Sequence, residues 1–196
     1  MRYYYPCKPN SLGVKSPYFD QLDNDVRWIA EVKKNGWRCL ADKDAGSFVL
    51  WTRHKTLVMD PLKDLRLALF SMLPNNTRID GELINNRTKD VKGIYYVFDI
   101  LVYKGEPLFN LPLRERRKIL EGAIKPLPFI ELAQQFTTGK KELYAKAILD
   151  EVNEGIVMKK LDSKYMVSQT RCLQNPYWLK VKKPEKHIYI KKGGTT

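Results

Sequence analysis

The sequence predicts an α+β fold, in which antiparallel strands form most of the structure and a few helices pack against them. Short runs rich in β-branched and aromatic residues follow one another in hairpin-like succession. Segments with apolar residues at helical spacing are fewer and lie between these runs. The chain has 196 residues, of which 43% are hydrophobic, enough for one well-buried core. We therefore expect one domain, residues 1–183, followed by a basic tail, residues 184–196.

The expected elements can be placed along the chain from these patterns. Strands are expected at residues 26–33, 37–41, 48–52, 78–84, 94–101, 129–133 and 155–160, and residues 178–182 also alternate as a strand. Helices are expected at residues 60–72, 113–123 and 139–152. Asp60 and Pro61 supply an N-cap and a first-turn proline for the first of these helices.

The charge of the chain indicates a polyanionic partner. Lys and Arg number 35 against 22 Asp and Glu, which gives a net charge of +13. Residues 155–196 hold ten Lys and Arg and two Asp and Glu, so +8 of the charge lies there. A membrane surface is the rival partner, but no stretch approaches the roughly 18 apolar residues of a span, and the N-terminus lacks a signal-peptide core. We expect an intracellular, cytoplasmic protein that does not bind membranes.

The cysteines indicate neither a disulfide framework nor a metal site. Cys7, Cys39 and Cys172 are an odd number at wide spacings that match no zinc pattern. We expect three reduced thiols.

The segment EVKKNGWR, residues 31–38, places Lys33 at the end of an apolar run and three residues before Gly36. A lysine in such a position can act as a nucleophile if nearby positive charges favour its neutral amine, and Lys34, Lys180 and Lys182 could supply these charges. Taken by itself, the octapeptide also fits an exposed lysine at a strand end before a glycine turn.

Four further motifs follow in order: DGEL at 80–83, YYVFDIL at 95–101, EGIVMK at 154–159 and WLKVK at 178–182. Together they resemble the collinear motifs of the ATP-dependent DNA ligases, members of the covalent nucleotidyltransferases that also include RNA ligases and mRNA capping enzymes. The resemblance runs from about residue 9 to 182 and includes the connecting segments at 103–120 and 161–165. It implies a nucleotidyltransferase (DNA ligase adenylation domain) fold, with two antiparallel sheets flanked by helices around a nucleotide cleft.

The resemblance assigns the first motif and one strand to ATP binding. Lys33 matches the lysine that attacks the α-phosphate of ATP and forms a lysyl-AMP phosphoramidate. Glu31 matches the reader of the adenine amino group, and Val32 is counted with the nucleotide-binding residues. Arg38 matches a ribose contact and Phe98 the aromatic ring that stacks on adenine. Without the resemblance, the residues favour an ordinary surface arginine and a core phenylalanine, because Phe98 lies in a run that looks buried.

Carboxylates and lysines from later motifs complete the expected catalytic set. Glu154 and Glu82 come from separate strands and suit Mg²⁺ (or Mn²⁺), a hard cation that binds oxygen ligands and bridges phosphates. Glu82 could also bind ribose hydroxyls. Lys180 and Lys182 alternate along one strand, so both can face the same side and neutralise charge on the transferred phosphorus. The alternative for each is a solvated strand face.

Nucleic-acid contacts are expected outside the nucleotide motifs. Arg53 matches an arginine that grips the 5′-phosphate at a nick, and Lys183 and Lys186 extend the basic surface. Neither His54 nor His187 occupies a motif position, so neither receives a role. The expected partner is nicked duplex DNA, and RNA-containing duplexes stay open as partners. The protein is expected to be a monomer.

The implied activity is sealing of nicks in duplex DNA through a lysyl-AMP intermediate. Asn35 departs from the family, because DNA ligases nearly always carry aspartate there while some RNA-joining relatives carry asparagine; an RNA or RNA/DNA hybrid ligase therefore stays open. A non-catalytic nucleic-acid-binding module is the alternative from another class. The 14 residues after Lys182 are too few for an OB-fold domain, so none is expected in this sequence.

Overall fold

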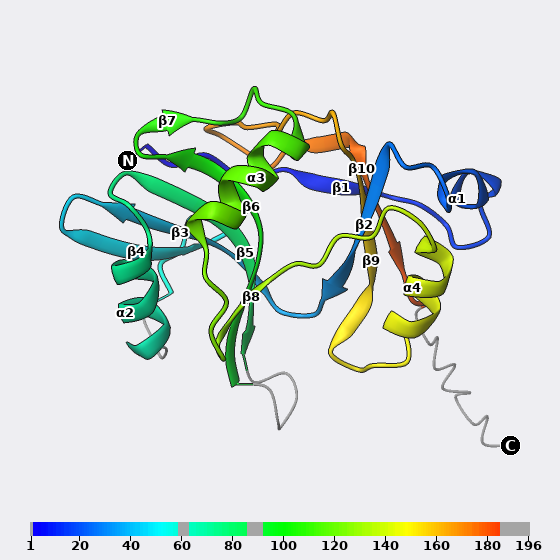
Figure 1. Cartoon of the computed structure of the whole chain (residues 1–196), viewed down its shortest axis with the longest axis horizontal. Coiled ribbons are helices and arrows are strands. Elements are labelled where there is room, and N and C mark those ends of the chain that lie inside the picture. Colours follow the sequence, from blue (N-terminus) through cyan, green and yellow to red (C-terminus); the bar gives the residue numbers. More distant parts are fainter. Residues whose placement is uncertain (1, 59–62, 86–91, 185–196) are drawn as a thin grey trace, which may run out of the picture.

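The computed structural model describes residues 2–58, 63–85 and 92–184. The polypeptide forms two lobes, each built on its own sheet (Figure 1). The larger lobe carries α2, α3 and β3 to β8, and the smaller lobe carries α1, α4 and the sheet that contains β2, β9 and β10. The α+β class with two sheets and few helices is confirmed.

The smaller sheet has the order β1 (Lys8–Ser11), β10 (Gln174–Lys182), β9 (Asn153–Lys160) and β2 (Trp28–Lys34). The last three strands pair antiparallel, whereas β1 lies parallel to β10. Helices α1 (Pro17–Leu22) and α4 (Lys140–Ala147) bury apolar side chains against this sheet. Phe19 of α1 and Tyr144 of α4 meet edge to face, with ring centroids 5.9 Å apart.

The larger sheet has the order β4 (Ser47–Thr52), β3 (Trp37–Asp44), β5 (Thr77–Asn85), β6 (Lys92–Tyr103) and β7 (Glu106–Pro107). The short β8 (Ile130–Leu132) pairs parallel with β6. Helices α2 (Lys63–Met72) and α3 (Leu113–Ala123) pack on this sheet through Leu65, Leu69 and Leu120, which are almost wholly buried. The larger lobe therefore has a hydrophobic core of its own.

A third cluster of buried residues joins the two sheets. Leu40 of β3 and Leu101 of β6 belong to the larger sheet, and Trp178 of β10 belongs to the smaller one. Tyr165 packs edge to face on Trp178, with ring centroids 5.4 Å apart. Because β2 leads directly into β3, the chain also passes from one sheet to the other at residues 35 and 36. These links connect the two sheets directly.

All expected strands and helices occur, but several boundaries and two strand directions differ from expectation. Each sheet contains one parallel pair, β1–β10 and β6–β8, so the sheets are not wholly antiparallel. Helix α4 ends at Ala147 instead of residue 152, because Asp150 accepts backbone hydrogen bonds from Val152 and Asn153 in a turn. The short α1, β1 and β7 were not expected. The N-cap assigned to Asp60 and Pro61 lies outside the described residues.

Cys7, Cys39 and Cys172 are free thiols, as expected. Within the described ranges, no helix has both the length and the apolar character needed to cross a bilayer. The tail beyond Pro184 lies outside the described residues.

Candidate active site

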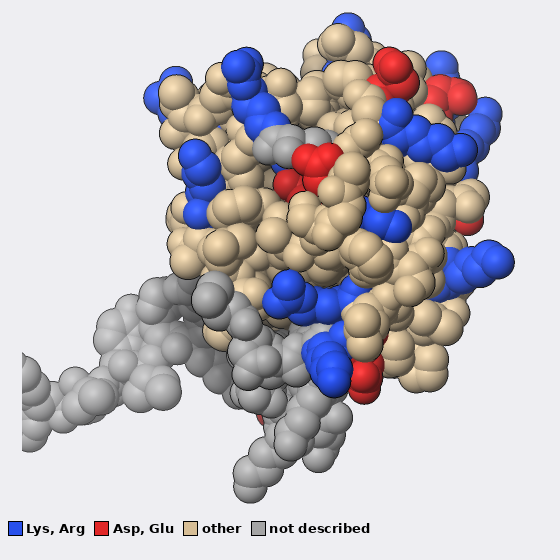
Figure 2. Space-filling view, turned by 90° about the vertical axis from the view of Figure 1, so that its left-hand side faces the viewer, with Lys and Arg blue, Asp and Glu red and all other residues tan. Residues whose placement is uncertain are grey.

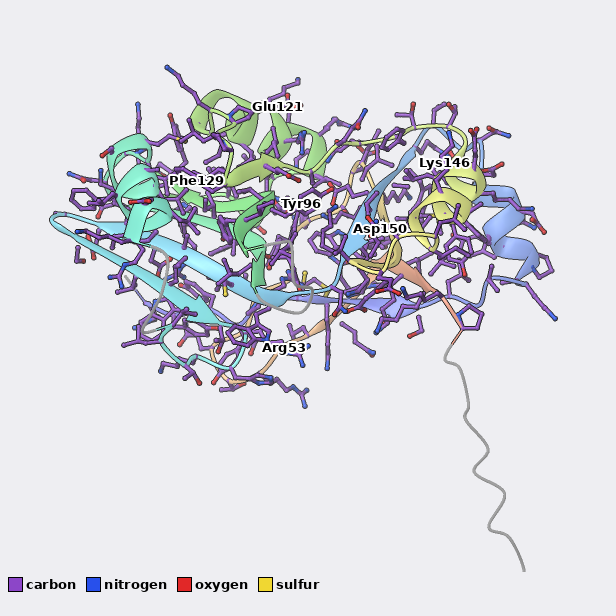
Figure 3. All side chains as sticks on the ribbon, turned by 90° about the horizontal axis from the view of Figure 1, so that it is seen from below. Arg53, Tyr96, Glu121, Phe129, Lys146 and Asp150 are labelled. Atoms are coloured by element: carbon purple, nitrogen blue, oxygen red, sulfur yellow. The ribbon has the colours of Figure 1, made fainter. Side chains whose placement is uncertain are left out.

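A cavity of about 700 Å³ opens between the two sheets. Its walls come from β2, β9 and β10 on one side and from β3, β5 and β6 on the other. Figure 3 shows Tyr96, one of the lining residues, near the middle of the molecule between the two lobes. Ten residues expected from the sequence line this cavity: Glu31, Val32, Lys33, Arg38, Arg53, Glu82, Phe98, Glu154, Lys180 and Lys182.

The turn between β2 and β3 fixes the position of Lys33. A Cβ atom on Gly36 would lie 2.5 Å from the carbonyl oxygen of Leu83, so only glycine fits this close to β5. The backbone N–H of Gly36 donates to Glu82 Oε1 at 3.1 Å, and the backbone N–H of Asn35 donates to the carbonyl of Val152 at 2.8 Å. The turn is thus tied to both sheets, and Lys33 lies just before it.

Glu154 brings two of the expected lysines together. Lys33 Nζ lies 2.9 Å and Lys182 Nζ 2.7 Å from Glu154 Oε2. The sheet register explains the convergence, because Lys33 of β2 and Lys182 of β10 both pair with Gly155, the residue after Glu154. Burial opposes the charge of Glu154, but the ammonium groups of Lys182 and Lys33 outweigh it and hold the pKa of this carboxyl below its usual value.

Positive charge also gathers around Lys180. Burial, followed by the charges of Lys182 and Lys33, lowers the pKa of Lys180 below its usual value. Lys34 lies farther along β2, with its Nζ 5.5 Å from the ring centroid of Tyr96. The expected group of lysines is therefore present in one cavity, but it includes a carboxylate, Glu154, placed directly against Lys33.

The two candidate metal-binding carboxylates have different environments. Burial raises the pKa of Glu82, and the nearby charges of Lys33 and Arg38 oppose this shift without cancelling it. The pKa of Glu154 shifts the other way. Both side chains line the same cavity, and no group of three or more His, Cys, Asp or Glu able to hold a metal occurs among the described residues.

Glu31 also lines the cavity and is 2% exposed. Its Oε2 accepts from Lys159 Nζ at 2.6 Å, and its Oε1 accepts from Gln135 Nε2 at 2.8 Å. Lys159 Nζ also lies 4.6 Å from the ring centroid of Phe98 and 4.5 Å from that of Trp178. A buried carboxylate, a buried ammonium and two aromatic rings thus lie together in the cavity, with Phe98 contributed by the opposite sheet.

Arg38 and Phe98 fit neither of the plain alternatives considered from the sequence. The Arg38 side chain is 15% exposed and makes a two-pronged contact with Asp80, with nitrogen–oxygen distances of 2.9 and 2.6 Å. It also donates to the hydroxyl of Tyr165 at 3.1 Å. Its guanidinium carbon lies 4.9 Å from the ring centroid of Phe98, which is half-buried. Arg38 is therefore not a free surface arginine, and Phe98 is not a fully buried core residue.

A second cavity, of about 840 Å³, adjoins the first and shares Lys8, Arg38, Arg53 and His54 with it. Arg171 also lines it, and no Asp or Glu is among its described lining residues. Figure 3 shows Arg53 away from Tyr96, at the edge of the larger lobe. On the end of the molecule shown in Figure 2, Lys and Arg side chains occur together with Asp and Glu side chains. The described lining of the second cavity, in contrast, has basic side chains and no acidic ones.

The last expected nucleic-acid contacts are less well placed. Lys183 does not line either cavity, and its backbone amide donates to the carbonyl of Glu154 at 2.9 Å. Lys186 lies outside the described residues. The structure adds Lys159, Trp178 and Gln135 to the site; the first two stand at the ends of motifs already noted, whereas no sequence pattern marked Gln135.

Comparison with known proteins agrees with this geometry. Residues 84–182 match the family model described as ATP dependent DNA ligase domain. A DNA ligase of Thermococcus onnurineus is 40% identical over 210 residues, covering 90% of this chain and 36% of the relative. A DNA ligase of Methanocorpusculum labreanum is 31% identical over 176 residues, covering 78% of this chain and 31% of the relative.

A solved structure described as mycobacterial DNA ligase D complexed with ATP and MES has the same fold. Its TM-score is 0.60 at 24% identity, and the alignment covers 79% of this chain and 54% of that one. The chain spans about a third of the length of the two curated relatives. The family match, the relatives and the two-sheet cleft agree, and the chain belongs to the ATP-dependent DNA ligase domain family.

Proposed function

We propose that residues 1–183 form the nucleotidyltransferase unit of a ligase that seals nicks in duplex DNA through a lysyl-AMP intermediate. The observation that carries this proposal is the position of Lys33, at the wall of the cavity between the two sheets and 2.9 Å from Glu154. A nucleophile, two further lysines, two carboxylates and an aromatic ring on one cavity are the groups that adenylyl transfer requires.

In the first step, the neutral amine of Lys33 attacks the α-phosphorus of ATP. A nitrogen–phosphorus bond forms, the bond to the bridging oxygen breaks, and pyrophosphate leaves with that electron pair. Glu154 Oε2, 2.9 Å from Lys33 Nζ, would orient the amine for attack, and the proton that the amine releases passes to solvent. Lys180 and Lys182 line the same cavity and would stabilise negative charge that develops on the phosphate oxygens.

In the second step, a 5′-phosphate oxygen attacks the same phosphorus, and the nitrogen–phosphorus bond breaks to regenerate the lysine. In the third step, the adjoining 3′-hydroxyl attacks the 5′-phosphate, a phosphodiester bond forms, and AMP leaves. The second cavity, which Arg53 lines, is the proposed binding site for the nucleic acid. Three basic side chains that are not held by an acidic partner in the described structure, Lys8, Arg53 and Arg171, line that cavity beside the nucleotide-binding one, which suits a phosphate backbone.

The carboxylates fit a magnesium ion that binds together with the nucleotide. Glu154 and Glu82 would hold the ion, since both line the cavity and offer the oxygen ligands that Mg²⁺ prefers. Two carboxylates are too few for a cage made by the protein alone, but Mg²⁺ is commonly held by one or two carboxylates, substrate phosphates and water. When bound, it would supply positive charge to the phosphates.

Self-labelling tests the first step directly. The protein incubated with α-labelled ATP and magnesium should acquire acid-labile AMP, and Lys33→Ala should acquire none. Lys34→Ala is the matched control, because Lys34 is the next residue along the same strand and its loss should leave AMP attached to Lys33. Labelling that persists in Lys33→Ala but disappears in Lys34→Ala would show that the neighbouring lysine is the nucleophile.

Sealing assays decide the substrate. Nicked DNA, nicked RNA and both hybrid junctions should be compared side by side, and we expect nicked DNA to be sealed best. Asn35 is the feature that favours the RNA-containing alternative, so preferential sealing of RNA or hybrid nicks would replace the DNA proposal. A protein that binds nicks but never labels would be a non-catalytic module.

A further inference from the structure

We propose that Gln135 is a positioning residue that orients Glu31 toward the nucleotide base and thereby sets the preference for adenine. This inference rests on the proposed function, because it requires Glu31 to meet the base amino group. Gln135 lies in the segment between β8 and α4 and is not among the residues that line the cavity. It therefore acts through Glu31 and not by touching the nucleotide.

The carboxylate of Glu31 is held at two points. Gln135 Nε2 donates to Oε1 at 2.8 Å, and Lys159 Nζ donates to Oε2 at 2.6 Å. Because Glu31 is only 2% exposed, water cannot easily replace either donor. An ionised carboxylate has about four acceptor positions, so two donors still leave capacity for an incoming N–H group.

The backbone places Gln135 beside Glu31 independently of its side chain. The next residue, Phe136, exchanges two backbone hydrogen bonds with Ala30 of β2, at 2.8 and 2.9 Å. Ala30 directly precedes Glu31, so this bridge brings the two side chains to the same level of the sheet. A substitution at Gln135 can therefore remove the donor without removing the contact that places the segment.

The two donors have different tasks. Lys159 neutralises the charge of Glu31 in a buried ion pair, where both side chains are 3% exposed, so its loss would leave a buried charge unpaired. Gln135 is neutral and half-buried. One donor alone leaves the carboxylate free to turn about its last side-chain bond, whereas a second donor on the other oxygen fixes its plane. Gln135 thus fixes the orientation of the Glu31 carboxylate, and a fixed orientation is needed to discriminate between the edges of different bases.

The test uses Gln135→Leu, which keeps a similar size and removes the donor. Gln134→Leu is the matched control, since the adjacent Gln134 side chain is exposed. The rate of Lys33 labelling is measured against concentration for ATP, GTP and the triphosphate of purine riboside, which lacks the 6-amino group. Circular dichroism melting of each variant monitors folding.

We expect Gln135→Leu to raise the half-saturating ATP concentration about tenfold, the effect of a misplaced hydrogen bond to a charged group. The maximal rate should stay within about twofold, and the preference for ATP over GTP should fall by a similar factor, about tenfold. Labelling by the purine riboside triphosphate should be unchanged, because that nucleotide has no amino group for Glu31 to read. Gln134→Leu should match the wild type with all three nucleotides.

Equal losses with ATP and with the purine riboside triphosphate would overturn the inference, since they would show that Gln135 only supports packing. An unchanged ratio of ATP to GTP would do the same. If Gln135→Leu does not fold, Gln135→Met gives the decision, because it keeps the unbranched shape of the side chain, removes the donor without adding a charge beside Glu31, and should show the same selective loss. Absence of labelling in the wild-type protein would instead refute the proposed function itself.

Discussion

Replacing Glu154 by Gln tests the charge balance of the cleft. The change keeps the size of the side chain but removes the anion that lies between Lys33 and Lys182. The contacts are 2.9 and 2.7 Å, and Glu154 and Lys33 are about one-fifth exposed, at 21% and 22%. Lys182 is 48% exposed, so solvent screens its contribution. In the variant, the repulsion among Lys33, Lys180 and Lys182 would no longer be offset by the negative charge of Glu154.

The expected destabilisation lies between the values for exposed and buried ion pairs. An exposed pair contributes about 0.2–1 kcal/mol, and breaking a buried pair costs about 3–5 kcal/mol. For partly exposed partners we expect Glu154→Gln to lower the free energy of unfolding by about 2 kcal/mol at pH 7. In a chain of this size, that corresponds to a decrease in melting temperature of about 4–8 °C.

The pH dependence has a definite sign. The folded-state pKa of Glu154 lies below its usual value of 4.5, so ionised Glu154 stabilises the fold fully above about pH 4.5. This stabilisation is lost as the pH falls through the folded-state pKa. The stability difference between wild type and Glu154→Gln should therefore be constant near neutrality and become smaller in acid.

Urea unfolding between pH 3.5 and 8 measures this difference. The matched control is Glu151→Gln, since Glu151 is exposed and lies three residues earlier in the chain. The control should stay within about 0.5 kcal/mol of the wild type. A Glu154→Gln difference that is no larger than the control's, or that grows as the pH falls, would refute the argument.

Three further predictions concern the turn, the second cavity and the first motif. Gly36→Ala should lower the free energy of unfolding by at least about 2 kcal/mol, because the new Cβ atom would clash with the Leu83 carbonyl. In the control Gly13→Ala, the Cβ atom meets open space, and urea unfolding should show a loss of less than about 0.5 kcal/mol. Arg171→Ala should reduce the slope of log affinity for nicked DNA against log salt concentration by about one unit, while self-labelling is retained. An unchanged slope would show that Arg171 does not contact a DNA phosphate. Asn35→Asp should leave sealing intact or lower the magnesium concentration that sealing requires, because a carboxylate can hold metal-bound water. If the variant folds but is inactive, the N–H donor of the Asn35 side chain is the essential group.

The sequence by itself determined the fold class and most of the cleft. Runs rich in β-branched and aromatic residues gave the strands, because such side chains pack well on a pleated, partly buried surface. The resemblance to the ligase family identified ten residues that do line one cavity, nine of them within the five motifs and the tenth, Arg53, outside them. The lysines at 180 and 182 could be placed on one face from their spacing alone. The basic charge also pointed to a polyanion, although it could not say where the charge gathers.

Tertiary structure decided which groups face one another. Glu154 meets Lys33 because β2 and β10 both pair with β9, and strand pairing is a long-range relation that no local pattern contains. The contact between Gln135 and Glu31 joins residues 104 positions apart, and no motif marked Gln135. The opposite pKa shifts of Glu82 and Glu154 likewise depend on burial and on neighbouring charges brought from other strands. Periodicity specifies which side of a strand is buried, whereas packing between sheets decides the partner of each side chain.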